Sequence, residues 1–105
     1  MKSIAWVSDS RSVVRAFPDE ARQRAGRQLA RVQDGLEPDD WKPMPSVGIG
    51  VREIRAHARG EYRIIYVARF AESIYVLHAF QKKAQRTPQR DINVARARFR
   101  ALIEQ

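Results

Sequence analysis

The residues of this chain that could do chemistry are mostly cations, and they lie where predicted strands begin or end. Arg55 and Arg63 flank a short connection, and Lys82 and Lys83 follow a third apolar segment. Arginine presents a planar fork of donors that matches phosphate oxygens, and lysine adds a compact point charge. If Arg55 and Arg63 face each other across their connection, the two side chains meet on one side of a sheet, because neighbouring strands lie about 4.8 Å apart. The spacing then favours a phosphate-binding site.

Two alternatives stay open at this level. Strand parity cannot be fixed from sequence, so the same cations also fit the solvated side of a sheet. His78 offers the side-chain type whose ordinary pKa lies nearest neutrality, which suits proton transfer. A histidine within an apolar strand is, however, more often a core residue. His57, near the predicted connection, is the weaker of the two histidine candidates.

The overall charge supports a polyanionic partner. The chain has 105 residues and a formal net charge of +8, from 20 Lys and Arg against 12 Asp and Glu. Four of the 20 are lysines, which leaves 16 arginines. Such a surplus favours nucleic acid ahead of a membrane surface, although charge that only keeps the chain soluble is the alternative.

The absence of other features narrows the classes further. No cysteine is present, so disulfides and cysteine-ligated zinc are excluded, and two histidines without a cluster of carboxylates predict no metal site. No apolar run is long enough to span a membrane, and the first residues have no signal-peptide core. We therefore expect a cytoplasmic protein without a metal or other cofactor.

The first half of the chain predicts one strand and two helical segments. Residues 4–8 are apolar enough for a short strand, and residues 8–17 fit one or two helical turns. Pro18 is expected to open a longer helix that ends near Gly35, because apolar residues recur at helical spacing and acidic residues lie in its first turn. The expected apolar stripe consists of Ala21, Ala25, Leu29 and Val32.

The second half changes to a period of two. Residues 35–50 contain several prolines and glycines and predict a loop, which Trp41 and Met44 attach to the core. Three β-rich segments follow, at 51–58, 62–70 and 73–80, and their short connections predict an antiparallel meander.

A last helix is expected from the Thr87–Pro88 pair onward. Thr87 suits the N-cap and Pro88 the first turn. The apolar stripe would be Ile92, Ala95, Phe99, Leu102 and Ile103. The resulting order is β-α-α-β-β-β-α, an α+β fold with a small twisted, mainly antiparallel sheet packed against helices. We expect residues 1–105 to form a single domain.

Three stretches of sequence carry a resemblance to a known family. They are VREIRAHARGEYRIIYV, YVLHAFQKKAQRTP and the run from Ala95 to Arg98. Together they cover about half the chain and resemble the phage-derived, HigB-like branch of the RelE/ParE toxin superfamily. The resemblance implies a RelE-like fold and the toxin of a type II toxin-antitoxin module. Many such toxins cut messenger RNA in the ribosomal A site without a metal, by attack of the 2′-hydroxyl on phosphorus.

The resemblance also implies roles for particular residues. The expected catalytic residues are Arg55, Arg63, His78, Lys82 and Lys83, and the expected RNA-binding residues are Arg52, Gln85, Arg86 and Arg90. Arginine stays protonated near neutrality, so proton transfer would fall to a lysine with a depressed pKa or to a histidine. Several relatives carry a tyrosine or histidine near the C-terminus, whereas this chain has neither after His78.

Partners and rival functions follow from the same resemblance. We expect the ribosome with its messenger RNA, and a cognate antitoxin of the helix-turn-helix type, and no membrane. One alternative is a non-enzymatic poison of DNA gyrase, as in the ParE branch. The other is a basic nucleic-acid-binding domain without catalysis.

Overall fold

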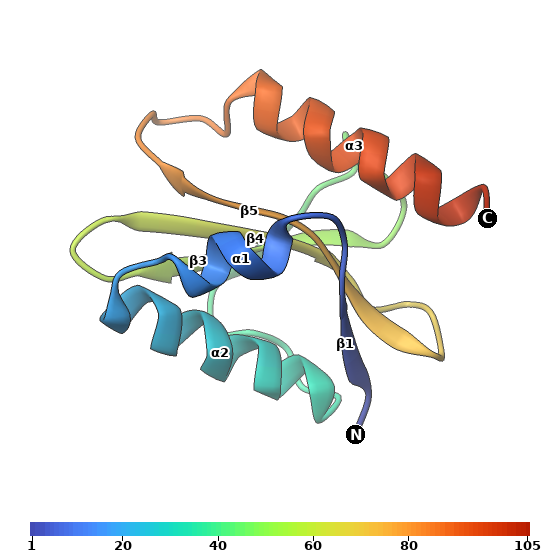
Figure 1. Ribbon diagram of the computed structural model, residues 1–105, viewed down its shortest axis with the longest axis horizontal. Helices are drawn as coiled ribbons and strands as arrows, with labels where there is room; N and C mark the ends of the chain where they lie inside the picture. Colours follow the sequence, from blue (N-terminus) through green and yellow to red (C-terminus); the bar gives the residue numbers. More distant parts are fainter.

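Five strands form one sheet that lies between two helices on one face and one helix on the other (Figure 1). The computed structural model describes residues 1–105. In chain order the elements are β1 (Ser3–Trp6), α1 (Ser10–Arg15), α2 (Asp19–Gln33), β2 (Trp41–Pro43), β3 (Val51–His57), β4 (Glu61–Val67), β5 (Ser73–Lys82) and α3 (Gln89–Ile103). The predicted α+β class is confirmed.

The strand order is β1-β5-β4-β3-β2, and the predicted meander of β3, β4 and β5 is antiparallel throughout. β1 pairs with β5 in parallel, with Ser3 opposite Ser73. The expected loop at 35–50 contains one strand that the sequence reading missed. Trp41 of this strand pairs with Ile54. The strand forms the outer edge of the sheet, where the missing N–H of Pro43 breaks no ladder.

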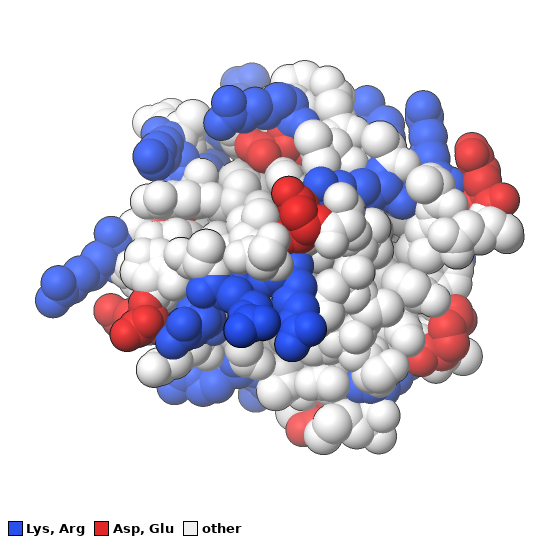
Figure 2. Space-filling model, viewed as in Figure 1, with Lys and Arg blue, Asp and Glu red and all other residues white.

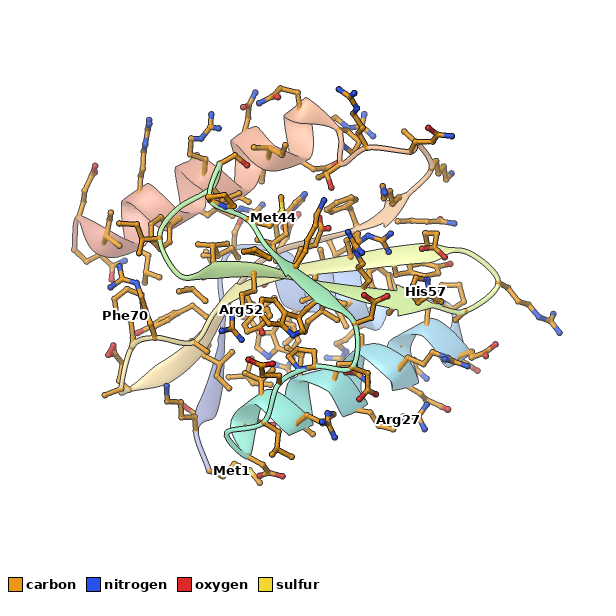
Figure 3. The ribbon with its side chains drawn as sticks, turned by 180° about the vertical axis from the view of Figure 1, so that it is seen from behind. Met1, Arg27, Met44, Arg52, His57 and Phe70 are labelled. Carbon is orange, nitrogen blue, oxygen red and sulfur yellow. The ribbon has the colours of Figure 1, made fainter.

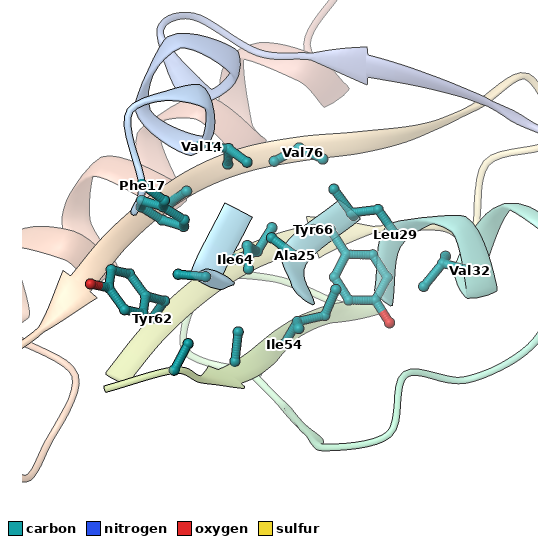
Figure 4. Close-up of a cluster of buried hydrophobic side chains, with 14 of the residues drawn as sticks. Val14, Phe17, Ala25, Leu29, Val32, Ile54, Tyr62, Ile64, Tyr66 and Val76 are labelled. Atoms are coloured by element: carbon teal, nitrogen blue, oxygen red, sulfur yellow. The ribbon is translucent and has the colours of Figure 1, made fainter. Parts of the chain in front are cut away.

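The face of the sheet toward α2 carries the larger apolar core (Figure 4). The predicted stripe of Ala21, Ala25, Leu29 and Val32 is buried and packs on this face. Tyr62 and Tyr66 are core residues there. The ring centroid of Tyr62 lies 4.8 Å from that of Phe17. Apolar side chains from α1, α2 and three strands thus fill one layer.

The opposite face carries a second apolar core beneath α3. Its members are Met44, Val47, Val51, Ile65, Val67, Leu77, Phe80, Ala95 and Phe99. The helix packs chiefly against β5, so it covers only part of this face. The predicted stripe is right for most positions and wrong for Ile103, which is 49% exposed. None of the helices combines the length and apolar character that crossing a membrane requires.

A bulge in β5 changes which side chains reach α3. Ile65 of β4 lies opposite His78, but the next residue, Tyr66, lies opposite Val76. Leu77 is therefore an extra residue on β5, and Leu77 and His78 both turn toward α3. A regular strand would have sent one of these two side chains to the other face.

The start of α3 differs from the prediction by one residue. Pro88, not Thr87, is the N-cap, and the helix begins at Gln89. The hydroxyl of Thr87 does not cap the helix but donates a hydrogen bond to Glu53 Oε2, at 2.9 Å. A buried carboxylate is the stronger acceptor, which explains why the hydroxyl turns toward the sheet.

Candidate phosphate-binding site

Four cations gather on the α3 side of the sheet, in the part that α3 leaves uncovered. They are Lys42, Arg55, Arg63 and Lys82, and we call them the cation cluster. The expected facing of Arg55 and Arg63 is confirmed, because they are direct partners across β3 and β4. In the strand register, Lys42 of β2 lies opposite Glu53 of β3. Lys82 of β5 lies opposite Glu61 of β4, which is on the same face of its strand as Arg63. Four neighbouring strands thus each contribute one cation.

Arg63 forms the buried centre of the cation cluster. Its side chain is only 5% exposed, and its Nη2 donates to Glu61 Oε1 at 3.0 Å. Its Nη1 donates to the carbonyl oxygen of Tyr62, also at 3.0 Å. Its Nε lies 3.7 Å from Glu53 Oε1, close enough for an ion pair but not for a hydrogen bond. The guanidinium is therefore fixed on two sides by carboxylates.

Two donors of the cation cluster have no acceptor within the protein. The Nε groups of Arg55 and Arg63 are buried and make no hydrogen bond. An unsatisfied buried donor costs about 1–3 kcal/mol, so this geometry is not the one that stability alone would select. Arg55, whose side chain is 36% exposed, offers a phosphate group a guanidinium with one unpaired donor, whereas Arg63 Nε faces Glu53 Oε1, which accepts no hydrogen bond either.

Lys82 is the member of the cation cluster whose protonation the site changes most clearly. Burial lowers the pKa of its ammonium group, and the nearby charge of Arg63 lowers this pKa further. Lys42 and Arg55 act in the same direction, and Glu53 opposes them. Lys82 thus gives up its proton more readily than an ordinary lysine, a property that general-base chemistry requires.

His78 lies away from the cation cluster, in a contact with α3. Its Nε2 is 2.7 Å from Asp91 Oδ1, and its ring stacks on Phe80 with centroids 5.4 Å apart. The side chain is 12% exposed. These contacts attach the first turn of α3 to β5, which is the structural role that the sequence left open for this histidine.

His57 lies at the end of β3 near the hairpin (Figure 3), in contact with two carboxylates. Its Nε2 is 2.7 Å from Asp40 Oδ2, and its Nδ1 is 2.8 Å from Glu61 Oε2. The hydrogen bond to Asp40 raises the pKa of His57, and that to Glu61 raises it further. Since Asp40 also pairs with Arg55, at 3.8 Å, His57 connects the carboxylates that flank the cation cluster.

The remaining predicted residues lie outside the cation cluster. Arg52 is on the α2 side of β3 (Figure 3), where its guanidinium covers the ring of Trp41 at 4.0 Å. Successive side chains of a strand point to opposite faces of the sheet. Arg52 and Arg55 are an odd number of residues apart on β3, so they lie on opposite faces. The other members of the predicted set are exposed, in the loop after β5 or at the start of α3: Lys83, Gln85, Arg86 and Arg90.

Basic side chains also gather elsewhere on the surface. Figure 2 shows Lys and Arg side chains over α1 and the adjoining part of α2, the two helices that pack on the other side of the sheet from α3. On α2, Arg22 pairs with Asp19 and Arg24 with Glu20, each at 3.2 Å. These exposed pairs fit a solvated helix face.

The sequence reading missed two members of the site. Lys42 lay in the segment taken for a loop, so nothing indicated its pairing with β3. Glu53 has the same strand parity as Arg55 and Val51, and that parity was the available signal that it points with them. No group of three or more His, Cys, Asp or Glu residues is placed to hold a metal ion.

The architecture is consistent with a RelE-like fold that carries cations on one face of its sheet. The model of a family described as "Phage derived protein Gp49-like (DUF891)" matches residues 12–100. The chain belongs to this family, which is associated with RelE and toxin-like proteins. A search of the curated proteins finds no match. The match confirms the phage-derived part of the resemblance and its association with RelE and toxin-like proteins, and the HigB-like branch stays a prediction.

Proposed function

We propose that the protein is the toxin of a type II toxin-antitoxin module and cuts messenger RNA on the ribosome. Its family supports the toxin class. The observation that carries the enzymatic part is the cation cluster, in which Arg55 and Arg63 face each other and Lys82 lies beside them. A phosphodiester is the ligand that this combination of charge and unsatisfied donors fits best.

Each member of the cation cluster has a distinct part in the proposed reaction. The partly exposed Arg55 donates to the scissile phosphate, and Arg63 supplies positive charge from beneath as negative charge grows on the oxygens. Neutral Lys82 takes the proton of the 2′-hydroxyl, whose oxygen bonds to phosphorus. The bond to the 5′-oxygen breaks, and that oxygen takes its proton from solvent. A cyclic 2′,3′-phosphate and a free 5′-hydroxyl result.

Other predicted residues have weaker roles in this proposal. The contacts of His78 with Asp91 and Phe80 support a structural part for it, away from the proton transfer. Lys83, Gln85 and Arg86, exposed in the loop after β5, are available to bind the RNA backbone around the scissile phosphate.

The ribosome supplies geometry that the protein lacks. The site offers one tuned lysine and no tyrosine or histidine from the last helix. Positioning of a substrate alone can lower the activation barrier by about 7–11 kcal/mol. An ordered messenger on the ribosome therefore compensates for weak acid–base groups. We expect negligible cleavage of free RNA, and a small antitoxin as the partner that holds the protein inactive in the cytoplasm.

Cleavage on programmed ribosomes, mapped by primer extension, tests the proposal. Wild-type protein should produce new messenger ends at the A-site codon. Arg55→Ala and Lys82→Ala should each lower the rate about a hundredfold or more, the usual cost of an electrostatic donor or a general base. Arg15→Ala, an exposed change on α1, is the matched control and should stay within about twofold of wild type.

Two outcomes would overturn this function. Efficient cutting of naked RNA by pure protein would remove the need for the ribosome. Growth arrest by folded protein, with DNA damage and without messenger cleavage, would instead support the gyrase poison.

A further inference from the structure

Glu53 is a buried carboxylate in the middle of the cation cluster that the proposed reaction does not use. Its side chain is 1% exposed, although it is a charged residue in the centre of a sheet. Lys42 Nζ and Arg63 Nε lie 3.8 and 3.7 Å from its Oε1, one on each side. Its Oε2 accepts the hydroxyl proton of Thr87 at 2.9 Å. Burial of a carboxylate is costly, so its retention calls for a reason beyond packing.

We propose that Glu53 is a positioning residue, which holds the cation cluster together and ties the basic loop of residues 83–88 to it through Thr87. The role in cleavage rests on the proposed function, whereas the placement of cations and loop does not. Glu53 touches neither substrate nor reacting atoms in this assignment. It acts through Arg63, Lys42 and Thr87.

Electrostatics accounts for the first half of the role. Like charges on neighbouring strands repel, and four cations on adjacent strands would splay toward solvent without a counter-charge. Glu53 lies between Lys42 on the edge strand and Arg63 on the central strand, so one carboxylate attracts both inward. The cations then keep a fixed spacing before any phosphate arrives, which lowers the cost of binding one.

The loop accounts for the second half. The chain leaves the sheet after Lys82 and enters α3 at Gln89, and between them lie Lys83, Gln85 and Arg86. Thr87 is the residue of this loop whose side chain bonds to the sheet, and its partner is on β3, 34 residues earlier. The exposed cations of the loop are therefore held beside the cation cluster rather than free to move away.

Two isosteric variants separate these functions. Glu53→Gln removes the charge but keeps an oxygen that can accept from Thr87. Thr87→Val keeps the charge of Glu53 and the shape of the side chain at 87 but removes the hydroxyl. Thr87→Ser restores the hydroxyl. Each is measured for binding of inorganic phosphate by NMR, for the titration of the Lys82 side chain, for backbone order in the loop and for cleavage on ribosomes.

For Glu53→Gln we expect phosphate to bind at least about threefold more weakly, because the cations lose their fixed spacing, although the site has also lost a negative charge. Cleavage should also slow at least tenfold, in kcat rather than KM, because the cations are misplaced. The pKa of Lys82 should fall further, because the charge of Glu53 raises this pKa. Without that charge, the lowering by Arg63, Lys42 and Arg55 is no longer opposed. Loss of the charge alone would tighten phosphate binding, so tighter or unchanged binding by a variant whose NMR spectrum is that of a folded protein overturns the proposal.

For Thr87→Val we expect order parameters in residues 83–87 to drop below about 0.6, with phosphate affinity within twofold and Thr87→Ser like wild type. An unchanged loop would overturn the tie between Thr87 and Glu53. If phosphate binding and loop order change as expected but the wild type cuts no messenger, the positioning role stands and the proposed function fails.

Discussion

The two faces of the sheet differ in how their helices cover them. On the α2 face, the inward side chains of β3, β4 and β5 beneath α1 and α2 are apolar, and Arg52 is the exception on this face of β3. On the α3 face, the same strands are apolar beneath α3 and charged beyond it. Arg63 is buried there but is paired with Glu53 and Glu61, because an unpaired buried charge is too costly. The uncovered half is thus free for function.

Adjacent residues of β4 show this contrast within one strand. Ile64 points into the α2 core and is fully buried, whereas Arg63 points to the α3 side among carboxylates. Stability and anion binding should therefore respond to different residues.

The largest expected effect on stability is from Ile64→Ala. The change leaves a cavity in a fully buried layer, and we expect a loss of about 2–5 kcal/mol in the free energy of unfolding. Ribosomal cleavage per folded molecule should stay within about twofold. Denaturant unfolding gives the first quantity, and Ile64→Val, with a loss of about 1 kcal/mol, is the graded control. A large fall in activity at full occupancy of the folded state would show that the two faces are coupled.

A smaller loss is expected when the contact of α3 with the sheet is weakened. Asp91→Asn keeps the shape of the side chain but removes the charge that faces His78 Nε2 at 2.7 Å. We expect a loss of about 1–3 kcal/mol in the free energy of unfolding, as for a buried charged hydrogen bond. Cleavage should change by less than about threefold.

A double-mutant cycle with His78→Gln checks the assignment of this loss to the pair. A coupling energy near zero would contradict it. A tenfold fall in cleavage with stability intact would instead place His78 in the proton transfer, as the sequence hypothesis had it.

Much of the fold could be predicted from the sequence, because helix stripes, turn residues and period-two strands are local signals. The hairpin made the facing of Arg55 and Arg63 a possibility, but only the observed register fixes it. Three features of the site depend on long-range pairing instead. The position of Lys42 could be predicted only if β2 was recognised as a strand. The role of Thr87 depends on its hydrogen bond to Glu53, and the direction of His78 depends on the bulge at Leu77. Each involves a partner far along the chain, which no local pattern reports.

The smallest expected effect comes from His57, the exposed counterpart of His78. Both ring nitrogens of His57 face carboxylates, of Asp40 and Glu61, so the protonated ring with two donors is favoured. The pKa is therefore raised above its ordinary value of about 6.5. A raised pKa means that the stabilisation is fully present below about pH 6.5 and is lost as the pH rises through the folded-state value.

Because the His57 side chain is 52% exposed, solvent screens these contacts and the contribution should be well below about 1 kcal/mol. The measurement is denaturant unfolding of wild type and His57→Gln at pH 6 and at pH 8.5. The stability difference between the two proteins should shrink at the higher pH, and any part due to His78 cancels in that difference. A difference that is constant with pH would show that His57 acts by shape alone, and the carboxylates beside the cation cluster would then be independent of its charge.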